Sequence, residues 1–417
     1  MKNKLRYIPI LTIIPMLSFG ISLKDVYSFT LQNDESIKTN YYDVESKKKD
    51  YDIQKARLYP NISSTLTKSN RTYLTNTEIQ RTEKENYNSL EFSLSQSIYD
   101  GSIYSSIKET KYDMKLQKIL LEEKKQETAL SAIDVFIDGL ISKSLIATTE
   151  KELKYYETKR LQFEKMYKLN LLAKNQLDKS KLDYNDIYIK LNEYKNDLKL
   201  EKLKLHHFMN KKVDSLEDVT DLDSYDANYE FDKLLLDNLK LKGGKVGIDL
   251  VKQRVQTSKT GHYPVLGLRA NYTKYDSNNY IDDYETDKRI LFELKIPLYE
   301  GGGTNAKIEQ NRLSYEASKM DLIDKIEQTK NEYEELMLLK EIQVEKIEIY
   351  SSAIKDTEIY YNSILKSFEK NLKNRVDLAE VEFMFAEKKH KIIEAKYEKL
   401  RINLRLKFLA GNLNLAL

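Results

Sequence analysis

The 417-residue sequence contains no cysteine and no tryptophan. Without cysteine the chain has no disulfide, no thiolate metal ligand and no cysteine nucleophile. It also has no residue to which an N-terminal lipid could be attached through sulfur. These absences exclude thiol chemistry and one common means of membrane anchoring.

The sequence also lacks an excess of one charge and a long apolar run. Lys and Arg number 69 against 66 Asp and Glu, so the net charge of +3 provides no nucleic-acid-binding footprint. After the N-terminus, no stretch reaches 18 uninterrupted apolar residues, and we expect no transmembrane helix. A chain of this kind that crosses a membrane must do so as a closed barrel. The 31 tyrosines suit a boundary between water and lipid.

The first residues have the pattern of a secretory signal peptide. Lys2, Lys4 and Arg6 form a positive region, and an apolar region follows from Tyr7 to Phe19. The apolar region is too short for a comfortable membrane span. We therefore expect a signal peptide over residues 1–20, with cleavage close to Gly20.

A pattern of strand, glycine and very long helix occurs twice. From 289 to 299, apolar residues alternate with mostly polar ones, as in a strand with one apolar face. The glycines Gly301, Gly302 and Gly303 follow, and a helical period then continues to Phe368. The earlier copy runs from Leu90 to Gly101 and leads into a helix ending near 166. We expect Gly101 and the three later glycines to be hinges between strands and helices.

The pattern extends to both halves of the chain, which predicts a duplicated architecture. The expected repeats are 21–212 and 229–417, joined by an acidic connector at 213–228. Each contains a helix, two strands, a long helix and a return helix. In the first repeat we expect helix 23–58, strand 61–73, polar loop 74–85, a strand from 90, helix 101–166, a turn near 170 and helix 172–209. In the second we expect helix 229–260, strand 265–275, polar loop 276–287, strand 289–299, helix 304–368, a turn near 371 and a last helix to 408.

The lengths of these elements predict the fold class. A helix of such length, at about 1.5 Å per residue, is close to 100 Å long and must be a coiled-coil limb. Four amphipathic strands per chain are too few to close a barrel. Three copies would supply about twelve, within the range of outer-membrane barrels. We therefore expect an α+β protein: helical coiled-coil hairpins forming a tunnel, with a trimeric 12-stranded barrel.

Four short segments carry a resemblance to a known family. They are ARLYPNIS at 56–63, HYPVLGL at 262–268, IPLYEGGG at 296–303 and FLAGNL at 408–413. In this order the chain resembles the TolC family of outer-membrane efflux and secretion channels, over essentially the whole mature sequence. The resemblance implies a homotrimer in the outer membrane that extends into the periplasm as a passive export conduit. It also implies two partners, a periplasmic adaptor (membrane fusion) protein and an inner-membrane transporter, and no cofactor.

The resemblance also indicates residues at the end of the tunnel. The family's tip motif is a Tyr-x-x-Gly turn before a helix that begins with acids. Phe368 and Asn371 stand at the turn of the second repeat, and Tyr167 and Asn170 at that of the first. Asp377 and Glu380 stand where the family places the carboxylates of the periplasmic aperture. The first repeat has no matching acid, only Asn175 and Gln176 nearby.

Other interpretations of the chain remain open at this point. Asp377 and Glu380 could be solvated residues of a first helical turn, where acids favour the helix dipole. The whole chain could be a trimeric coiled-coil stalk or an envelope adaptor without a channel. We expect no enzyme, because no nucleophile and base occur in a recognisable order. His206 and His207 are adjacent and point to different helix faces, so we expect no metal site.

Overall fold

The computed structural model describes residues 20–75, 81–277 and 286–415. Apart from Gly20, the predicted signal peptide lies outside these residues. The chain forms two compact units, and each takes segments from both predicted repeats. The first unit combines Met1–Lys38, Lys125–Leu234 and Asn331–Leu417, and the second combines Thr39–Lys124 and Leu235–Lys330. The two units therefore do not coincide with the repeats 21–212 and 229–417, whose boundaries stay a prediction.

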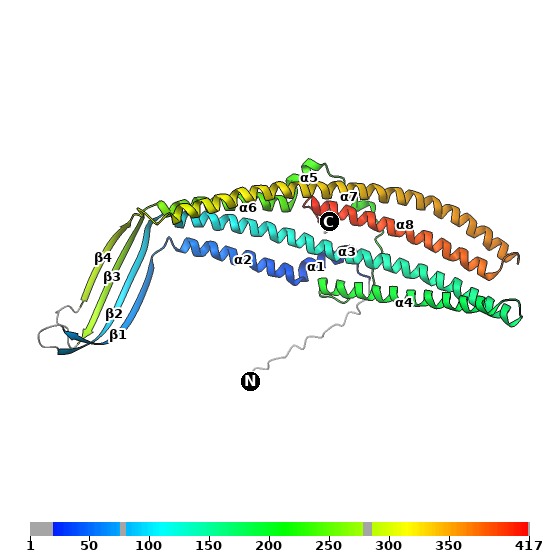
Figure 1. The fold of residues 1–417 in the computed structure, drawn as a ribbon, viewed down its shortest axis with the longest axis horizontal. Helices are drawn as coiled ribbons and strands as arrows, with labels where there is room; N and C mark the ends of the chain where they lie inside the picture. The colour runs from blue at the N-terminus through cyan, green and yellow to red at the C-terminus, as the bar shows by residue number, and fades with distance from the viewer. Residues whose placement is uncertain (1–19, 76–80, 278–285, 416–417) are drawn as a thin grey trace, which may run out of the picture. The chain divides into compact units, whose positions relative to one another are not determined.

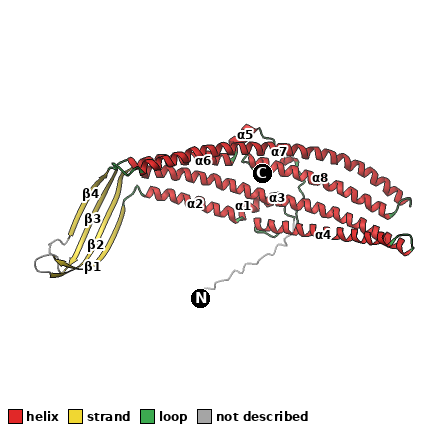
Figure 2. Ribbon diagram, viewed as in Figure 1, coloured by secondary structure: helices red, strands yellow, loops and turns green. Residues whose placement is uncertain are grey.

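The second unit is built on an antiparallel four-stranded sheet whose order follows the chain (Figure 1). Its strands are β1 (Asn61–Thr75), β2 (Arg81–Asp100), β3 (Val265–Ser277) and β4 (Thr286–Lys295). Helix α2 (Glu35–Ala56) leads into β1, and α6 (Leu239–Lys259) leads into β3 through the short η2 (Thr260–His262). The long helices α3 (Gly101–Lys168) and α7 (Gly303–Glu369) follow β2 and β4 (Figure 2).

Several strand boundaries differ from the sequence prediction. The polar loop expected at 276–287 is shorter at both ends, because β3 continues to Ser277 and β4 begins at Thr286. The polar loop expected at 74–85 is wrong at both ends, because β1 continues to Thr75 and β2 begins at Arg81. Thr75 pairs directly with Arg81, so backbone pairing extends both strands where apolar alternation has ended. The last strand ends at Lys295 and not near Tyr299. Lys295 pairs with Val265, the first residue of β3, so the chain beyond it has no partner strand.

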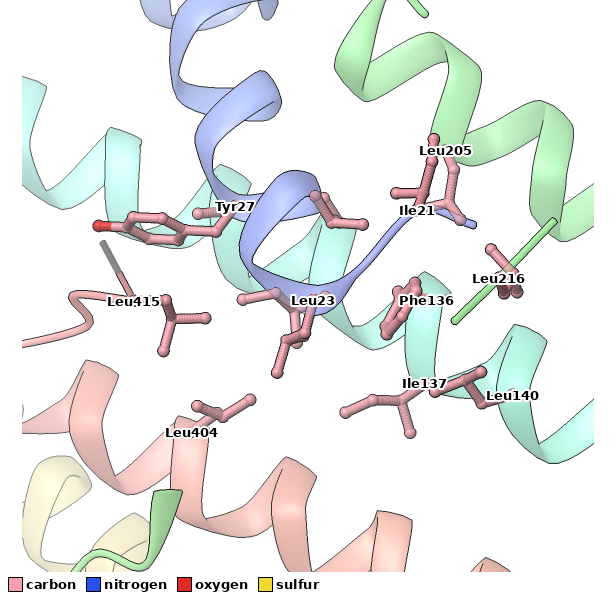
Figure 3. Close-up of a cluster of buried hydrophobic side chains, with 14 of the residues drawn as sticks. Ile21, Leu23, Tyr27, Phe136, Ile137, Leu140, Leu205, Leu216, Leu404 and Leu415 are labelled. Carbon is pink, nitrogen blue, oxygen red and sulfur yellow. The ribbon is translucent and has the colours of Figure 1, made fainter. Parts of the chain in front are cut away.

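The first unit is helical and contains most of the buried side chains. In addition to the second halves of α3 and α7 it holds α1 (Leu23–Asn33), α4 (Lys174–Met209), η1 (Asp223–Tyr225), α8 (Arg375–Leu409) and the first half of α5 (Phe231–Asp237). Its main core joins α1, α3, α4, the connector and α8 around fully buried Phe136 and Leu404 (Figure 3). The predicted connector 213–228 takes part in this core through Val213 and Leu216.

The connector also pairs with the N-terminal segment through two backbone hydrogen bonds. Ile21 donates from its backbone nitrogen to the Ser215 carbonyl at 3.0 Å, and Glu217 donates back to the Ile21 carbonyl at 3.0 Å. Ile21 is buried in the core beside Leu216 (Figure 3). Ile21 therefore belongs to the folded first unit, directly after the cleavage site predicted close to Gly20.

Two helices predicted as continuous are interrupted. The helix expected at 23–58 breaks at Asp34, whose carboxylate accepts from the backbone nitrogens of Ser36 at 2.9 Å and Ile37 at 3.2 Å. The helix expected at 229–260 breaks at Asn238, whose side chain accepts from the Leu241 nitrogen at 2.9 Å. Short polar side chains satisfy the free N–H groups of a new helix start, and here they override the helical spacing.

Helices α3 and α8 pack antiparallel along the first unit. Gln126 donates to the Gly411 carbonyl at 3.1 Å, and Thr148 donates to the Ala386 carbonyl at 3.2 Å. Between them, Arg405 donates to Asp134 at 3.0 Å. Within the described residues, no helix is long and apolar enough to span a membrane.

Candidate functional site

The two faces of the sheet differ in chemistry, because the strand register places apolar residues of all four strands on the same side. Ile62 pairs with Leu94, Leu94 with Ala270, and Ala270 with Ile290. Phe92 pairs with Tyr272, and Leu268 pairs with Phe292. Several of these side chains are unusually exposed: Ile62 is 71% exposed, and Ile290 and Phe292 are each 70% exposed. A contiguous exposed apolar face of this kind indicates a surface that water does not cover in the working protein.

The apolar face is a slanted band. Residues paired directly across the four strands form a row, and Ile62 and Ile290 lie in the same row. Ile62 is the apolar residue of β1 nearest the helices, whereas Ile290 is the apolar residue of β4 farthest from them. Leu66 lies in the row of Thr286, four residues beyond Ile290. Both edges therefore shift by about 13 Å over three strand spacings of about 4.8 Å. The corresponding angle, about 40°, matches the strand tilt of membrane barrels.

The opposite face of the sheet is polar and internally paired. The Ser63 and Ser93 hydroxyls lie 2.7 Å apart, and the Asn271 amide donates to Glu91 at 2.8 Å. Arg269 lies 3.6 Å from the Glu293 carboxylate. Side chains of this kind line water-filled interiors.

The predicted glycine hinges have different geometries. Gly301 and Gly302 adopt φ of +62° and +82°, a region that favours glycine, and Gly303 begins α7. Gly101 is the first residue of α3 and follows β2 without a break. At Gly101 the constraint is space, because an added Cβ would lie 2.9 Å from the Tyr263 ring.

The two predicted tip turns have the same backbone geometry. Asn170 and Asn371 have φ of +59° and +58°. In the first turn, Asn170 donates to the Tyr167 carbonyl and Leu171 to the Met166 carbonyl, each at 2.9 Å. In the second, Asn371 donates to Phe368 at 2.9 Å and Leu372 to Ser367 at 2.8 Å. Both are Schellman motifs, in which one left-handed residue satisfies the last carbonyls of a helix.

Asp377 occupies a capping position at the start of α8. Its nitrogen donates to the Asn374 side chain at 3.0 Å, and its carboxylate accepts from the Asn374 nitrogen at 3.0 Å. This capping box is a structural role that sequence reasoning missed, although the Asn-x-x-Asp spacing could have indicated it. Helix α4 begins at Lys174, and its N-cap residue Ala173 makes no side-chain cap hydrogen bond.

Glu380 lies one turn beyond Asp377 and is exposed. Burial raises the pKa of the Tyr155 hydroxyl on α3, and the negative charges of Glu380 and Asp183 raise it further. Glu382 lies 3.7 Å from Lys151, also on α3. The acids at the start of α8 therefore lie beside the last turns of α3. Within the described residues, no cluster of three or more His, Cys, Asp or Glu could hold a metal ion.

Comparison with known proteins finds relatives among outer-membrane efflux and secretion proteins. Residues 231–412 match the family model "Outer membrane efflux protein". The alkaline protease secretion protein AprF of Pseudomonas aeruginosa is 28% identical over 186 residues, 44% of this chain and 38% of AprF. The proteases secretion protein PrtF of Dickeya chrysanthemi is 25% identical over 180 residues, 42% of this chain and 39% of PrtF. The matched segments thus span less than two fifths of each relative.

These matches support assignment of the chain to the TolC family of outer-membrane efflux proteins. The E. coli outer membrane protein TolC itself is 17% identical over 353 residues, 79% of this chain and 70% of TolC.

A solved structure shares the fold over nearly the whole chain. The CmeC outer membrane channel of Campylobacter jejuni superposes with a TM-score of 0.79 at 12% identity, covering 94% of this chain and 86% of CmeC. The family model covers the α7 and α8 turn with Phe368, Asn371, Asp377 and Glu380, whereas Tyr167 and Asn170 lie outside it. The TolC-like fold of strands and long helices predicted from the sequence is confirmed.

Proposed function

We propose that the protein is the outer-membrane channel of a tripartite efflux pump or type I secretion system, a passive conduit for export. The slanted apolar band on one face of the sheet carries this proposal. Its angle of about 40° is the tilt that strands need in a lipid-facing barrel. The opposite polar face would line the water-filled lumen. A coiled-coil stalk without a channel would require neither face.

The working form is a homotrimer with twelve strands. In one chain, β1 and β4 are the outer strands of an open sheet. Open sheet edges are not tolerated in lipid, so each β4 must pair with β1 of the next copy. Three copies give an even strand number within the observed range of outer-membrane barrels.

The relatives support a proposal about the partners and the cargo. A channel of this family receives its cargo from a periplasmic adaptor and an inner-membrane transporter. AprF and PrtF are both named for protease secretion. We therefore expect a secreted protein as the first cargo to test. Comparison of the culture medium of a deletion strain with that of its parent, alongside drug accumulation, separates protein export from small-molecule efflux.

Asp377 and Glu380 form the periplasmic aperture of this trimer. They are three residues apart on one helical face, so threefold symmetry would gather six carboxylates around the axis. Rings of acids favour cations and can hold a multivalent cation across a pore. The tip turns at Asn170 and Asn371 close the hairpins at the same end of the first unit (Figure 1).

The proposal is tested with the full chain in detergent and in planar bilayers. Light scattering should give a mass about threefold that of one chain, whose unprocessed mass is 49.1 kDa. The same preparation should form ion-conducting channels. A monodisperse monomer, or a trimer that does not conduct, would contradict the proposal.

A further inference from the structure

The apolar band is bounded by lysines at one edge only. On β1, the next residue on the apolar face beyond Leu66 is Lys68. On β3, Lys274 follows Tyr272 on that face, and on β4, Lys288 lies beyond Ile290. On β2 the corresponding residue is Asn88. Three of the four strands thus place a lysine at the first position outside the band, on the side away from the helices.

The edge nearest the helices has no such lysines. Beyond Ile62 the corresponding residue is Pro60, and beyond Leu94 it is Gln96. Lysines that only kept their charge out of lipid would be expected at both edges, since both meet water. The asymmetry therefore indicates that the two membrane surfaces present different chemistry to the protein.

The three lysines follow the slant of the band. Lys288 lies in the row of Tyr272, Lys274 in the row of Leu90, and Lys68 in the row of Asn88. In a barrel tilted by about 40°, these positions stand at nearly the same height. All three side chains are exposed, and within the described residues no carboxylate forms an ion pair with any of them. Asp276 is the next residue on this face of β3, beyond Lys274.

An apolar groove adjoins the lysine edge. Its volume is about 300 Å³, and its lining includes Lys288 together with Ile62, Phe92, Leu94, Ala270, Tyr272 and Ile290. Lys288 is held over the Tyr272 ring, with its Nζ 5.7 Å from the ring centroid. The groove therefore places an apolar surface directly beside the positive charge of Lys288. A molecule that fills both must have an anionic head and an apolar tail.

We propose that Lys68, Lys274 and Lys288 bind the phosphate groups of lipids in the leaflet at the loop end of the barrel, with an acyl chain in the adjoining groove. This proposal rests on the proposed function, because it requires the apolar face to be in a membrane. A lysine near an anionic lipid surface contributes about 1 kcal/mol, or about fivefold in binding. Three copies of the chain would form a belt of nine lysines.

The experiment is a lipid-preference measurement on the full-length protein. The protein in neutral detergent is mixed with equal amounts of phosphatidic acid and phosphatidylcholine of the same acyl chains, and bound lipid is counted by native mass spectrometry. The wild type should retain phosphatidic acid at least about tenfold better. The variant K68Q/K274Q/K288Q should lose that preference, whereas K68R/K274R/K288R should keep it.

A matched control removes the same charge elsewhere. Lys111, Lys115 and Lys118 are three exposed lysines on α3, and K111Q/K115Q/K118Q should keep the preference. Should the triple band variant fail to assemble, K288Q alone should lower the preference about fivefold. Inorganic phosphate in hundredfold excess should not displace the lipid.

The outcomes separate this inference from the proposed function. Conducting trimers whose preference survives K68Q/K274Q/K288Q would overturn the lipid site alone. Equal loss in the α3 control, or displacement by inorganic phosphate, would also overturn it. Failure of the wild type to form conducting trimers would instead refute the function on which the inference rests.

Discussion

At the scale of single residues, Asp377 has two separable properties: a charge and a hydrogen-bonding oxygen. The capping box with Asn374 uses the oxygen, whereas the proposed aperture uses the charge. An asparagine in this position keeps an acceptor for the Asn374 nitrogen, but alanine removes both properties. The two substitutions therefore distinguish the structural role from the proposed functional one.

We predict that Asp377→Asn combined with Glu380→Gln weakens cation selectivity and leaves thermal stability nearly unchanged. Asp377→Ala should in addition lower stability by about 1 kcal/mol per chain, because the start of α8 loses its cap. Bilayer recordings under a salt gradient and thermal melts of the same proteins measure the two effects. If Asp377→Asn with Glu380→Gln leaves selectivity unchanged, the acids serve the helix only.

A second residue-scale prediction concerns His390, which is buried between α8 and α3. Its Nδ1 lies 3.1 Å from the Ser144 hydroxyl. Burial lowers the pKa of His390 below its ordinary 6.5 and Lys391 lowers it further, while Glu394 and Glu387 oppose the shift. Below pH 6.5 the unfolded chain therefore binds a proton that the folded chain does not. Stability should fall as the pH falls through this range.

Melts of wild type and His390→Gln between pH 5 and pH 8 test this expectation. The wild type should lose more stability toward pH 5 than the variant. The carboxylates that titrate in the same range are common to both proteins, so the difference between the two curves reports on His390. Parallel curves for the two proteins would show that His390 contributes nothing to the pH dependence.

At the scale of elements, the two faces of the sheet differ sharply in chemistry. Phe92 lies in the apolar band, and its neighbour Ser93 faces the polar side. We predict that Phe92→Lys costs about 2–4 kcal/mol in membrane insertion, because it places a charge in the lipid-facing band. Ser93→Lys, one residue away, should be tolerated. The yield of trimer from the outer-membrane fraction compares them, and equal yields would refute the assignment of the faces.

The junction between β4 and α7 allows a similar comparison. Gly302→Ala forces a Cβ into a backbone with φ of +82° and should cost about 1–2 kcal/mol. Gly303 is the first residue of α7, and a Cβ added there would have no atom within 4 Å. We therefore expect Gly303→Ala to leave stability unchanged or to increase it. The midpoint of thermal unfolding measures both. A larger loss for Gly303→Ala would mean that the conformation of Gly302 is not the constraint.

The sequence patterns predicted which helices and strands form much better than they predicted the residues at which these elements begin and end. The alternation at Phe92 and Phe292 indicated the apolar face, because a period of two is a property of local spacing. The extension of β2 to Arg81 depends on pairing with Thr75, and the break at Asp34 depends on a side chain turned back onto the helix start. Such features depend on a partner, which spacing alone does not reveal. For the same reason the sequence suggested Asp377 but not its bond to Asn374.

At the scale of the whole molecule, neither predicted repeat contains the complete main core. The main core of the first unit combines Ala129, Phe136 and Leu205 from the first repeat with Leu400 and Leu404 from the second. We predict that residues 229–417 alone do not fold, because several buried side chains would each lose about 1.5–3 kcal/mol of burial. Size-exclusion chromatography and circular dichroism test this prediction. Co-expression with residues 21–228 should restore folded protein, and a monodisperse helical fragment without it would refute the prediction.

The two hairpins end in the same Schellman turn, but their return helices begin differently. Helix α8 starts with the Asn374 capping box, whereas α4 has Ala173 at its N-cap position and no side-chain cap. A missing cap leaves the first N–H groups of a helix to water and lowers the free energy needed to fray its first turn. The start of α4 should therefore open and close far more often than that of α8. Local unfolding at the tip should therefore begin in the first hairpin, at the start of α4. If opening of the tip requires both hairpins, its rate would be limited by the rarer fraying of the first turn of α8.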